Sequence, residues 1–562
     1  MTASGKSWTG GNLPDTLITV AGQEMAFGAR SAGFRYENVA VEQTDRRLQL
    51  NATFDLSSPA LRVTRHYRIV SGTPTFEAWT TFESTSGRVE LSDLNAARLV
   101  LAAGTIHWLT GLEGDNAGVE MDDAFTRQQV DLPAGQQWSI GATGRASEKT
   151  VPWFAIDGGG AEFYAALMWS GAWSARIDRA GNTFVTTIGL APMTTTLANA
   201  DASIDGPHVV FGAVAGGLTE ATAALRSYIL NGLRDGRPLK PLVTYNTWFA
   251  YGTEVDQESM MTEMDRVAAL GTELFVIDAG WYAGAGAAGP GDFDAGLGSW
   301  TPDPVKFPNG LTPLRDHAHE LGMKFGVWVE PERVNLSMLD AAGHGDIDES
   351  WLATAGGEYG SDHAGQICLA NDAARAYIVA RLSALIDALQ PDYLKWDNNM
   401  WVNCDRGGHG HGAADGNFAH VNALYDILSK LRESYPDLLI ENVSGGGNRL
   451  DLGMLRYTDA AWMDDRTAPS VHVRHNLEGL SAVFPPAYLL SFVTDHGGEP
   501  LHDSPDLSLY FRSRMAGALG LCFRSESFSD SDVAGIAHEI DIYKAMRDTL
   551  SQAAGALLTK QA

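Results

Sequence analysis

Carboxylates recur at the ends of short apolar runs in residues 240–550, where they could carry out acid–base and nucleophilic chemistry. Tryptophans accompany them in the same runs. One carboxylic acid of a pair can protonate a leaving group while a second carboxylate attacks as a nucleophile, and indole faces stack on the C–H face of a pyranose. These residue types therefore indicate a sugar-cleaving site. The carboxylates are Asp278, Glu330, Asp397, Glu441, Asp464, Asp465 and Asp495, and the tryptophans are Trp248, Trp281, Trp328, Trp396 and Trp462.

Lys395 and Asp397 are two positions apart in the run YLKWDNN (393–399). In a strand, residues two apart point to one face, so we expect both side chains at the same site. An ammonium beside a carboxylate favours the ionised form that a nucleophile needs, although a structural ion pair remains the alternative. The same two alternatives, substrate contact or structural hydrogen bonding, stay open for Glu330 and Glu332.

The elements that would position these residues are eight apolar runs that alternate with helical stripes. Strand and helix in alternation predict parallel strands joined by right-handed crossovers, and eight repeats predict a closed (β/α)8 barrel. Active sites of such barrels lie at the carboxyl ends of the strands, where the acids fall. The predicted strands are 243–248, 274–280, 324–331, 393–399, 438–447, 460–465, 487–495 and 517–523.

The first 235 residues have a different texture. Leu48, Leu50, Ala52, Phe54 and Leu56 alternate with polar residues, which predicts a strand with one buried and one wet face. Few stretches there carry a helical stripe, so we expect an antiparallel β-sandwich over 1–235. The segment LRDGRPLKP (233–241) is a plausible linker. A catalytic barrel over 236–550 and a short tail over 551–562 complete the predicted domains.

Composition narrows the partners. The 562 residues carry 40 Lys and Arg against 69 Asp and Glu, a net charge of −29, which excludes a basic face for nucleic acid and attachment to an anionic membrane. Three cysteines do not make a disulfide framework, and the sequence shows neither a signal peptide nor an apolar stretch that could span a membrane. We expect a cytoplasmic protein with a small-molecule sugar substrate. Whether it forms a homo-oligomer is left open.

Several long, ordered motifs carry a family resemblance: YNTW, IDAGW, GSWTPDPVKFPNGLTPLRDHAHELGMKFGVWVEPERVN, YLKWDNN and ENVSGGGNRLDLGMLRYTDAAWMDD. With them, residues 240–548 resemble the catalytic domain of glycoside hydrolase family 36, the α-galactosidases. The resemblance implies an N-terminal β-supersandwich followed by a TIM barrel. The chain stops soon after Lys544, so the family's usual C-terminal β domain is expected to be absent or vestigial.

The resemblance implies a role for individual residues. Asp397 matches the family's nucleophile and Asp465 its acid/base, which implies a retaining, two-step hydrolysis. No metal and no organic cofactor is implied. Positions that hold the terminal sugar, with weaker support for the last two, are matched by Trp248, Asp278, Trp328, Lys395, Asn442 and Gly446.

Four positions depart from the family pattern, and three of them, Ala279, Val443 and the missing arginine, concern recognition of the terminal sugar. Ala279 replaces the second of two aspartates that the family places on the galactose O4 and O6 hydroxyls, Val443 replaces a cysteine, and Asp464 replaces a serine. The family's arginine before a helix is absent from 363–366. The alternatives to an α-galactosidase are therefore a hydrolase of β-L-arabinopyranosides or α-glucosides and a transglycosylase. A non-catalytic sugar-binding protein and a metal-dependent hydrolase are weaker alternatives.

The segment after 393–399 contains residues that could bind a metal, namely Cys404, Asp405, His409 and His411. A flexible loop that shapes the side of the leaving group is the interpretation we favour from sequence. Cys368 and Cys522 are expected to be small apolar core residues.

Overall fold

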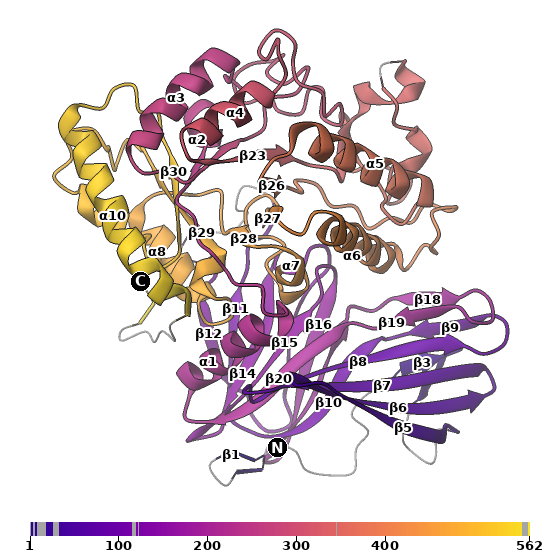
Figure 1. Ribbon diagram of the computed structural model, residues 1–562. Coiled ribbons are helices and arrows are strands. Elements are labelled where there is room, and N and C mark those ends of the chain that lie inside the picture. The colour runs from indigo at the N-terminus through magenta and orange to yellow at the C-terminus, as the bar shows by residue number, and fades with distance from the viewer. Residues whose placement is uncertain are drawn as a thin grey trace.

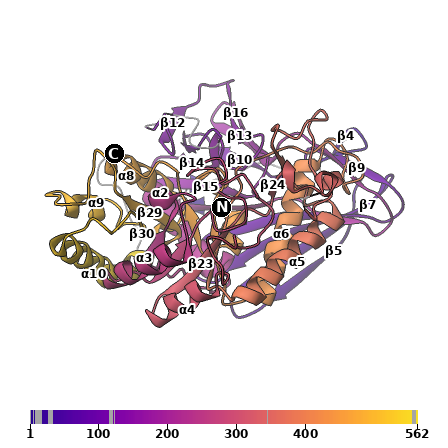
Figure 2. The ribbon, with the colours of Figure 1, turned by 90° about the horizontal axis from the view of Figure 1, so that it is seen from above.

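The computed structural model describes residues 2–3, 6–7, 18–25, 33–114, 120–121, 123–343, 345–552 and 560–561. An N-terminal β domain lies beside a C-terminal barrel, with α10 and the pair α5 and α6 on opposite sides of the barrel (Figures 1 and 2). The predicted fold, a β-sandwich followed by a TIM barrel, is confirmed. Among the described residues, no helix has the length and apolar character needed to cross a membrane. The predicted tail 551–562 lies mostly outside the described residues.

A ten-stranded antiparallel sheet forms one layer of the β domain, and a four-stranded sheet in the order β10-β17-β16-β13 faces it across an apolar core. The large sheet contains β5 (Arg35–Gln43), β6 (Arg47–Ser57), β7 (Ala60–Val70), β8 (Thr75–Ser84), β11 (Thr105–Thr110), β12 (Arg127–Asp131), β14 (Thr150–Asp157), β15 (Ala161–Met168), β19 (Ser203–Asp205) and β20 (His208–Ala215). The smaller sheet contains β10 (Asn95–Ala102), β13 (Gln137–Ala142), β16 (Trp173–Ala180) and β17 (Thr183–Leu190).

Smaller elements complete this domain. A second four-stranded sheet has the order β18-β9-β3-β4, and a helix with a final π turn follows β20. The elements are β1 (Thr2–Ala3), β2 (Lys6–Ser7), β3 (Ile18–Val20), β4 (Gln23–Met25), β9 (Val89–Ser92), β18 (Thr194–Leu197), α1 (Leu218–Tyr228) and η2 (Ile229–Leu233).

The strand predicted from alternating leucines is β6, but its burial differs from the prediction. Leu56 is buried, whereas Leu50 and Phe54 are half-buried and Leu48 is exposed. β6 lies next to the edge strand β5, where the large sheet extends beyond the layer that covers its centre. The period of two correctly predicted the strand and overstated how well one face is covered.

Eight parallel strands close into a barrel in chain order, and each coincides with a predicted run. The observed strands are shorter than the runs, because the last residues of each run, including all of the acids except Glu441, turn into the loops at one mouth. The strands are β21 (Thr244–Asn246), β22 (Leu274–Ile277), β23 (Lys324–Val329), β26 (Tyr393–Trp396), β27 (Leu439–Asn442), β28 (Ala460–Trp462), β29 (Leu489–Thr494) and β30 (Ala518–Cys522).

Helices cover the outside of the barrel, and local sequence explains their ends. α5 begins where the Asn371 side chain accepts hydrogen bonds from the amides of Ala373 and Ala374, and it ends where Gln390 adopts a left-handed conformation before Pro391. The helices are α2 (Trp248–Tyr251), α3 (Gln257–Ala269), α4 (Thr312–Glu320), α5 (Asp372–Leu389), α6 (Gly416–Ser434), α7 (Leu452–Tyr457), α8 (Ser470–Leu480), α9 (Leu507–Arg512) and α10 (Asp530–Gln552). Between β23 and α5, β24 (Arg333–Asn335) pairs with β25 (Ala364–Gln366), and η5 (Glu349–Trp351) lies between these two strands.

The β domain reaches into the loops at the barrel mouth. Arg145 donates to the backbone carbonyl of Asn398 (3.0 Å), and the Ser147 hydroxyl donates to the carbonyl of Gly447 (2.6 Å). The same hydroxyl accepts from the amide of Leu450 (2.7 Å). These contacts join the first domain to the loops that follow β26 and β27.

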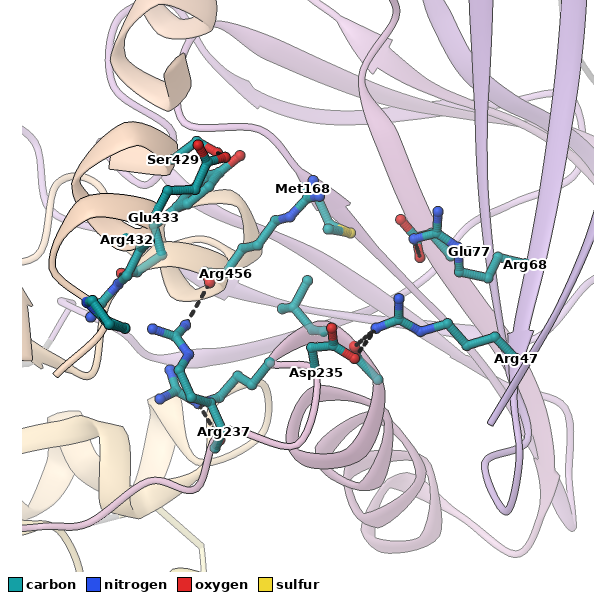
Figure 3. A pocket seen from close by; sticks show the side chains of 15 residues that line it. Arg47, Arg68, Glu77, Met168, Asp235, Arg237, Ser429, Arg432, Glu433 and Arg456 are labelled. Carbon is teal, nitrogen blue, oxygen red and sulfur yellow. Dashed lines mark hydrogen bonds and ion pairs between the residues drawn. The ribbon is translucent and has the colours of Figure 1, made fainter. Parts of the chain in front are cut away.

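A second contact region between the domains is a pocket of about 360 Å³ lined by six arginines (Figure 3). Acids balance this charge: Asp235 pairs with Arg47, and Asp459 pairs with Arg234 and Arg432. The pocket lies where η2 and the end of α6 meet, in the region of the change from β domain to barrel. We propose that the domain boundary lies near residue 235, between η2 and β21.

Candidate active site

Asp397 follows directly after β26 and receives four hydrogen bonds. Its Oδ1 accepts from the amides of Asn398 (2.8 Å) and Gly445 (3.4 Å). Its Oδ2 accepts from the indole of Trp328 (3.1 Å) and from Nδ2 of Asn399 (2.9 Å). With 8% of its surface exposed, the residue is almost enclosed. The donors come from three neighbouring strand ends and fix the orientation of the carboxylate.

Lys395 lies two residues before Asp397, within β26. It pairs in register with Trp328 of β23 on one side and Glu441 of β27 on the other. Its Nζ lies 2.6 Å from Oδ2 of Asp278 and 3.9 Å from the centre of the Trp462 ring. The expected ion pair therefore exists, but its partner is Asp278 and not Asp397. The direct contact of Lys395 is thus a structural ion pair with Asp278.

The charge of Lys395 follows from its neighbours. Burial opposes the charged form, but the carboxylates of Asp278, Glu441 and Asp397 outweigh burial and raise the pKa of Lys395 well above its ordinary value. Asp278 also accepts from Nδ2 of Asn246 (2.6 Å), so both of its direct side-chain donors are buried. These carboxylates thus favour a positively charged Lys395 beneath the mouth.

Asp464 and Asp465 are adjacent after β28 but have different surroundings. Asp464 is buried and accepts from His472 (2.9 Å), Asn476 (3.0 Å) and Arg466 (3.1 Å). Burial raises the pKa of Asp464, but these hydrogen bonds and the Arg466 charge outweigh it and lower that pKa overall. Asp465 is half-buried. Hydrogen bonds to α8 therefore hold the Asp464 side chain, and Asp465 is the more accessible carboxylate of the two.

A tight turn after β27 touches both predicted catalytic aspartates. The amide of Gly445 donates to Asp397, and Gly446 packs against the backbone of Asp465. Gly446 has φ +82°, and a Cβ at this position would lie 3.1 Å from the amide nitrogen of Asp465. Both the backbone conformation and the lack of space therefore require glycine. The Ser444 hydroxyl anchors the turn by donating to the carbonyl of Asn398 (2.9 Å).

The tryptophans divide into two groups. Trp248 is half-buried and packs edge-on against Phe293, with 5.3 Å between ring centres. The other four indoles are at most 1% exposed, so the prediction that they offer faces for a sugar to stack on is wrong. Trp281 donates to the carbonyl of Trp328 (2.9 Å) and Trp396 donates to Glu332 (2.9 Å). Trp328 contributes its N–H to the site, and the others brace the barrel.

Three further carboxylates are structural in their contacts. Glu332 binds Arg449 (2.8 Å) and His420 (2.8 Å), and although burial raises the pKa of Glu332, these partners outweigh it and lower that pKa to about 2. Glu330 binds Arg333 (2.9 Å), yet burial raises the pKa of Glu330 to about 7. Asp495 is exposed and accepts from the amide at position 501. Glu330 and Glu332 both make structural hydrogen bonds, and substrate contact by either residue stays a prediction.

Asn442 lies at the end of β27 and is buried. Its Nδ2 donates to the carbonyl of Arg449 (2.8 Å), which ties the strand to the loop that follows. Of the residues predicted to bind the sugar, Asn442 and Gly446 therefore shape the loop after β27. Trp328 donates a hydrogen bond to Asp397. Asp278 pairs with Lys395.

Asn399 was not predicted as a site residue. It bridges two carboxylates, because its Nδ2 lies 2.9 Å from Oδ2 of Asp397 and 3.2 Å from Oε2 of Glu330. Its position two residues after Asp397 in an extended segment was the available signal, since alternate residues share a face. The Gly445 contact had no such signal, because it depends on how two adjacent loops turn.

With this geometry in place, comparison with known proteins identifies the family. The family model described as Melibiase matches residues 203–553. The chain belongs to the Melibiase family, glycoside hydrolase family 36. The matched segment includes the whole barrel and every candidate site residue above.

Curated members of the family show similarity over part of their length. The chain is 35% identical over 257 residues to alpha-galactosidase 2 of Pediococcus pentosaceus, which covers 44% of the chain and 34% of that protein. It is 28% identical over 345 residues to alpha-galactosidase Mel36A of Lactobacillus acidophilus, covering 59% of the chain and 45% of that protein. The chain thus matches between a third and a half of these relatives.

Solved structures of family members share the fold over nearly the whole chain. The alpha-galactosidase from Lactobacillus brevis superposes with a TM-score of 0.82 at 21% identity, covering 97% of this chain and 74% of that one. The GH36 alpha-galactosidase AgaA from Geobacillus stearothermophilus superposes with a TM-score of 0.80 at 20% identity, covering 96% and 76%. The fold, a β domain followed by a barrel, is therefore common to these proteins.

Proposed function

We propose that the protein is a retaining exo-glycosidase that removes terminal α-galactoside-like residues from small oligosaccharides or glycosides. The observation that carries this proposal is the pair of aspartates around the 444–447 turn. Asp397 is oriented by four hydrogen bonds, and Asp465 follows on the other side of the turn in a more accessible position. One fixed carboxylate and one accessible carboxylate suit a nucleophile and an acid/base.

The names of the relatives support the same reaction. Curated relatives in bacteria and fungi are named alpha-galactosidases, and an AgaA variant from Geobacillus stearothermophilus has been crystallised with stachyose. By analogy, a galactosyl group at the end of a small soluble sugar is the substrate class we propose. We also propose that the protein acts in the cytoplasm.

The reaction would proceed in two displacements. Asp397 attacks the anomeric carbon while Asp465 protonates the departing glycosidic oxygen, which leaves a covalent glycosyl-enzyme. Asp465 then takes a proton from water, and that water attacks the anomeric carbon and releases Asp397. Two inversions at one carbon give net retention. The charge of Lys395 beneath the mouth, paired with Asp278, would help to hold the carboxylates in place.

A second candidate is the same chemistry on an altered sugar, and Ala279 is the observation that favours it. Ala279 is buried in the apolar core of the barrel, and its methyl group cannot bind a hydroxyl. Asp278, beside it, is already bound to Lys395 and Asn246. A β-L-arabinopyranoside lacks the C6 hydroxymethyl group, and an α-glucoside has the opposite configuration at C4. Neither sugar therefore presents both galactose hydroxyls, O4 and O6, to the side chains at 278 and 279.

A panel of aryl glycosides with the purified protein tests both candidates. The panel compares kcat/KM for the α-galactoside, the β-L-arabinopyranoside and the α-glucoside, and proton NMR follows the anomer that is released first. A 100-fold lead of one sugar corresponds to about 2.7 kcal/mol, the size of one charge-assisted hydrogen bond. Release of the opposite anomer would refute retention. An α-galactoside lead above 100-fold would refute the altered sugar.

A further inference from the structure

Four side chains that bind soft metals meet beside the candidate active site. Cys368 lies between β25 and α5, whereas Cys404, His409 and His411 lie between β26 and α6. The candidate ligand atoms of all four lie within 4.8 Å of one another. The sequence pattern contained three of these residues, and the fold adds Cys368, which was expected only to fill the core.

The distances in this cluster suit a tetrahedral ion. Cys368 Sγ lies 3.4 Å from Nε2 of His411, and Cys404 Sγ lies 3.5 Å from Nδ1 of His409. Zinc bonds of about 2.3 Å to sulfur and 2.0–2.1 Å to nitrogen place a sulfur and a nitrogen ligand about 3.6 Å apart on a tetrahedron. Each cysteine–histidine pair therefore already forms an edge of the required length.

The hydrogen bonds of both histidines favour the tautomer that metal binding needs. Nε2 of His409 donates to the carbonyl of Ser350 (2.7 Å), which leaves Nδ1 to face Cys404. Nδ1 of His411 donates to the carbonyl of Gly412 (2.7 Å), which leaves Nε2 to face Cys368. A carbonyl accepts only from a protonated ring nitrogen, so in the neutral imidazole the nitrogen that faces the thiol carries the lone pair. Metal-binding histidines are oriented in this way by their second nitrogen.

Burial of the cluster and the contacts of Asp405 show which side chains can serve as ligands. Cys368, Cys404 and His409 are buried, and an apolar cluster containing Ala353, Ala370 and Val402 surrounds the sulfurs. Asp405, which the sequence placed among the candidate ligands, instead accepts from Thr354 (3.0 Å) and from the amide at position 356 (2.7 Å). The ligand set is thus two cysteines and two histidines.

We propose that Cys368, Cys404, His409 and His411 bind one structural zinc ion. Four protein ligands leave no open position for water or substrate, which is the arrangement of a structural site and not of a catalytic one. Binding releases the two thiol protons to solvent, so two thiolates and two neutral imidazoles balance the charge of Zn²⁺. Thiolate and imidazole ligands together favour zinc over magnesium or calcium.

The ion would join two loops of the barrel mouth. One is the long connection after β23 that contains Ser350 and Cys368, and the other begins at Asn398, directly after Asp397. A metal link between them would hold the loop that follows the proposed nucleophile without contacting substrate. Loss of the ion is therefore expected to loosen this part of the mouth.

Metal analysis of the full chain, purified without a histidine tag and passed through a desalting column after exposure to Zn²⁺, tests the proposal. We expect inductively coupled plasma mass spectrometry to find about one zinc ion per chain. Cys404→Ser and His409→Ala should each lower this content at least tenfold. Cys522→Ser changes a buried cysteine outside the cluster and should retain one zinc. Equal zinc in the wild type and the two cluster variants would overturn the site.

A spectroscopic measurement on the wild type covers the case in which the variants do not fold. X-ray absorption at the zinc edge should show two sulfur ligands at about 2.3 Å and two nitrogen ligands at about 2.0–2.1 Å. A shell of oxygen and nitrogen only would overturn the proposal, as would wild-type protein that retains no zinc. A disulfide between Cys368 and Cys404 in protein purified under reducing conditions would also overturn it.

Discussion

The ammonium of Lys395 lies 2.6 Å from Oδ2 of Asp278, and both side chains are buried at the bottom of the barrel mouth. The residues are 117 positions apart and come from strands separated by β23. The aromatic face of Trp462 covers the ammonium at 3.9 Å. The ion pair lies beneath the other carboxylates of the mouth, and its ammonium attracts them.

Breaking this pair should destabilise the protein. Lys395→Met leaves a buried, uncompensated carboxylate, and removing one partner of a buried pair costs roughly 3–5 kcal/mol of unfolding free energy. The double variant Asp278→Asn with Lys395→Met should recover part of that loss, because it also removes the carboxylate with which the lysine pairs directly. Urea unfolding of the single and double variants measures the coupling. Losses that simply add would show that the two groups do not interact.

Replacing the proposed nucleophile should abolish turnover without unfolding the protein. Asp397→Asn keeps the size and removes the charge that attacks the anomeric carbon, so kcat on an aryl glycoside should fall by roughly 10³-fold or more. A mechanism-based inhibitor should label Asp397 in the wild type. Asp495→Asn, at an exposed strand end, is the matched control and should retain activity. Near-normal turnover of Asp397→Asn, free of wild type, would refute the role.

The two adjacent aspartates after β28 should separate in a leaving-group test. Asp465→Ala should reduce kcat/KM for natural glycosides far more than for aryl glycosides with good leaving groups, which need little protonation. Azide should restore turnover of Asp465→Ala and yield a glycosyl azide with the anomeric configuration of the substrate. Asp464→Ala should instead lower stability, because His472, Asn476 and Arg466 lose their shared acceptor. The leaving-group signature in Asp464→Ala would reverse the assignment.

Glu441 should make stability depend on pH. Burial, opposed by Lys395, raises the pKa of Glu441 to about 7 in the folded protein, against about 4.3 in an unfolded chain. The folded state therefore binds this proton more tightly. Its contribution to stability is fully present below about pH 4.3 and is lost as pH rises through about 7. Relative to Glu441→Gln, the wild type should lose melting temperature as the pH rises from about 4.3 to about 7. Parallel curves for the two proteins would contradict the shift.

Local patterns predicted the elements and could not predict their contacts. The eight barrel strands followed from apolar runs, and the acids at their ends followed from the architecture of a parallel barrel. The partner of Lys395 did not follow, because the rotamer of a long side chain decides between Asp278 and Asp397. Cys368 lies 43 positions from His411, so only the folded loops bring these residues together. The indoles were misjudged because sequence does not distinguish a tryptophan that lines a cleft from one that fills the wall behind it.

The hydrogen bonds that join Arg145 and Ser147 to the loops after β26 and β27 affect how the barrel folds during synthesis. The ribosome releases the β domain first, and N-terminal domains generally fold first during synthesis. The surface that receives the Asn398 and Gly447 carbonyls then already exists when those residues emerge. The first domain would act as a template for the mouth of the second, and a barrel transplanted into another protein without it would arrive with two of its loops unsupported.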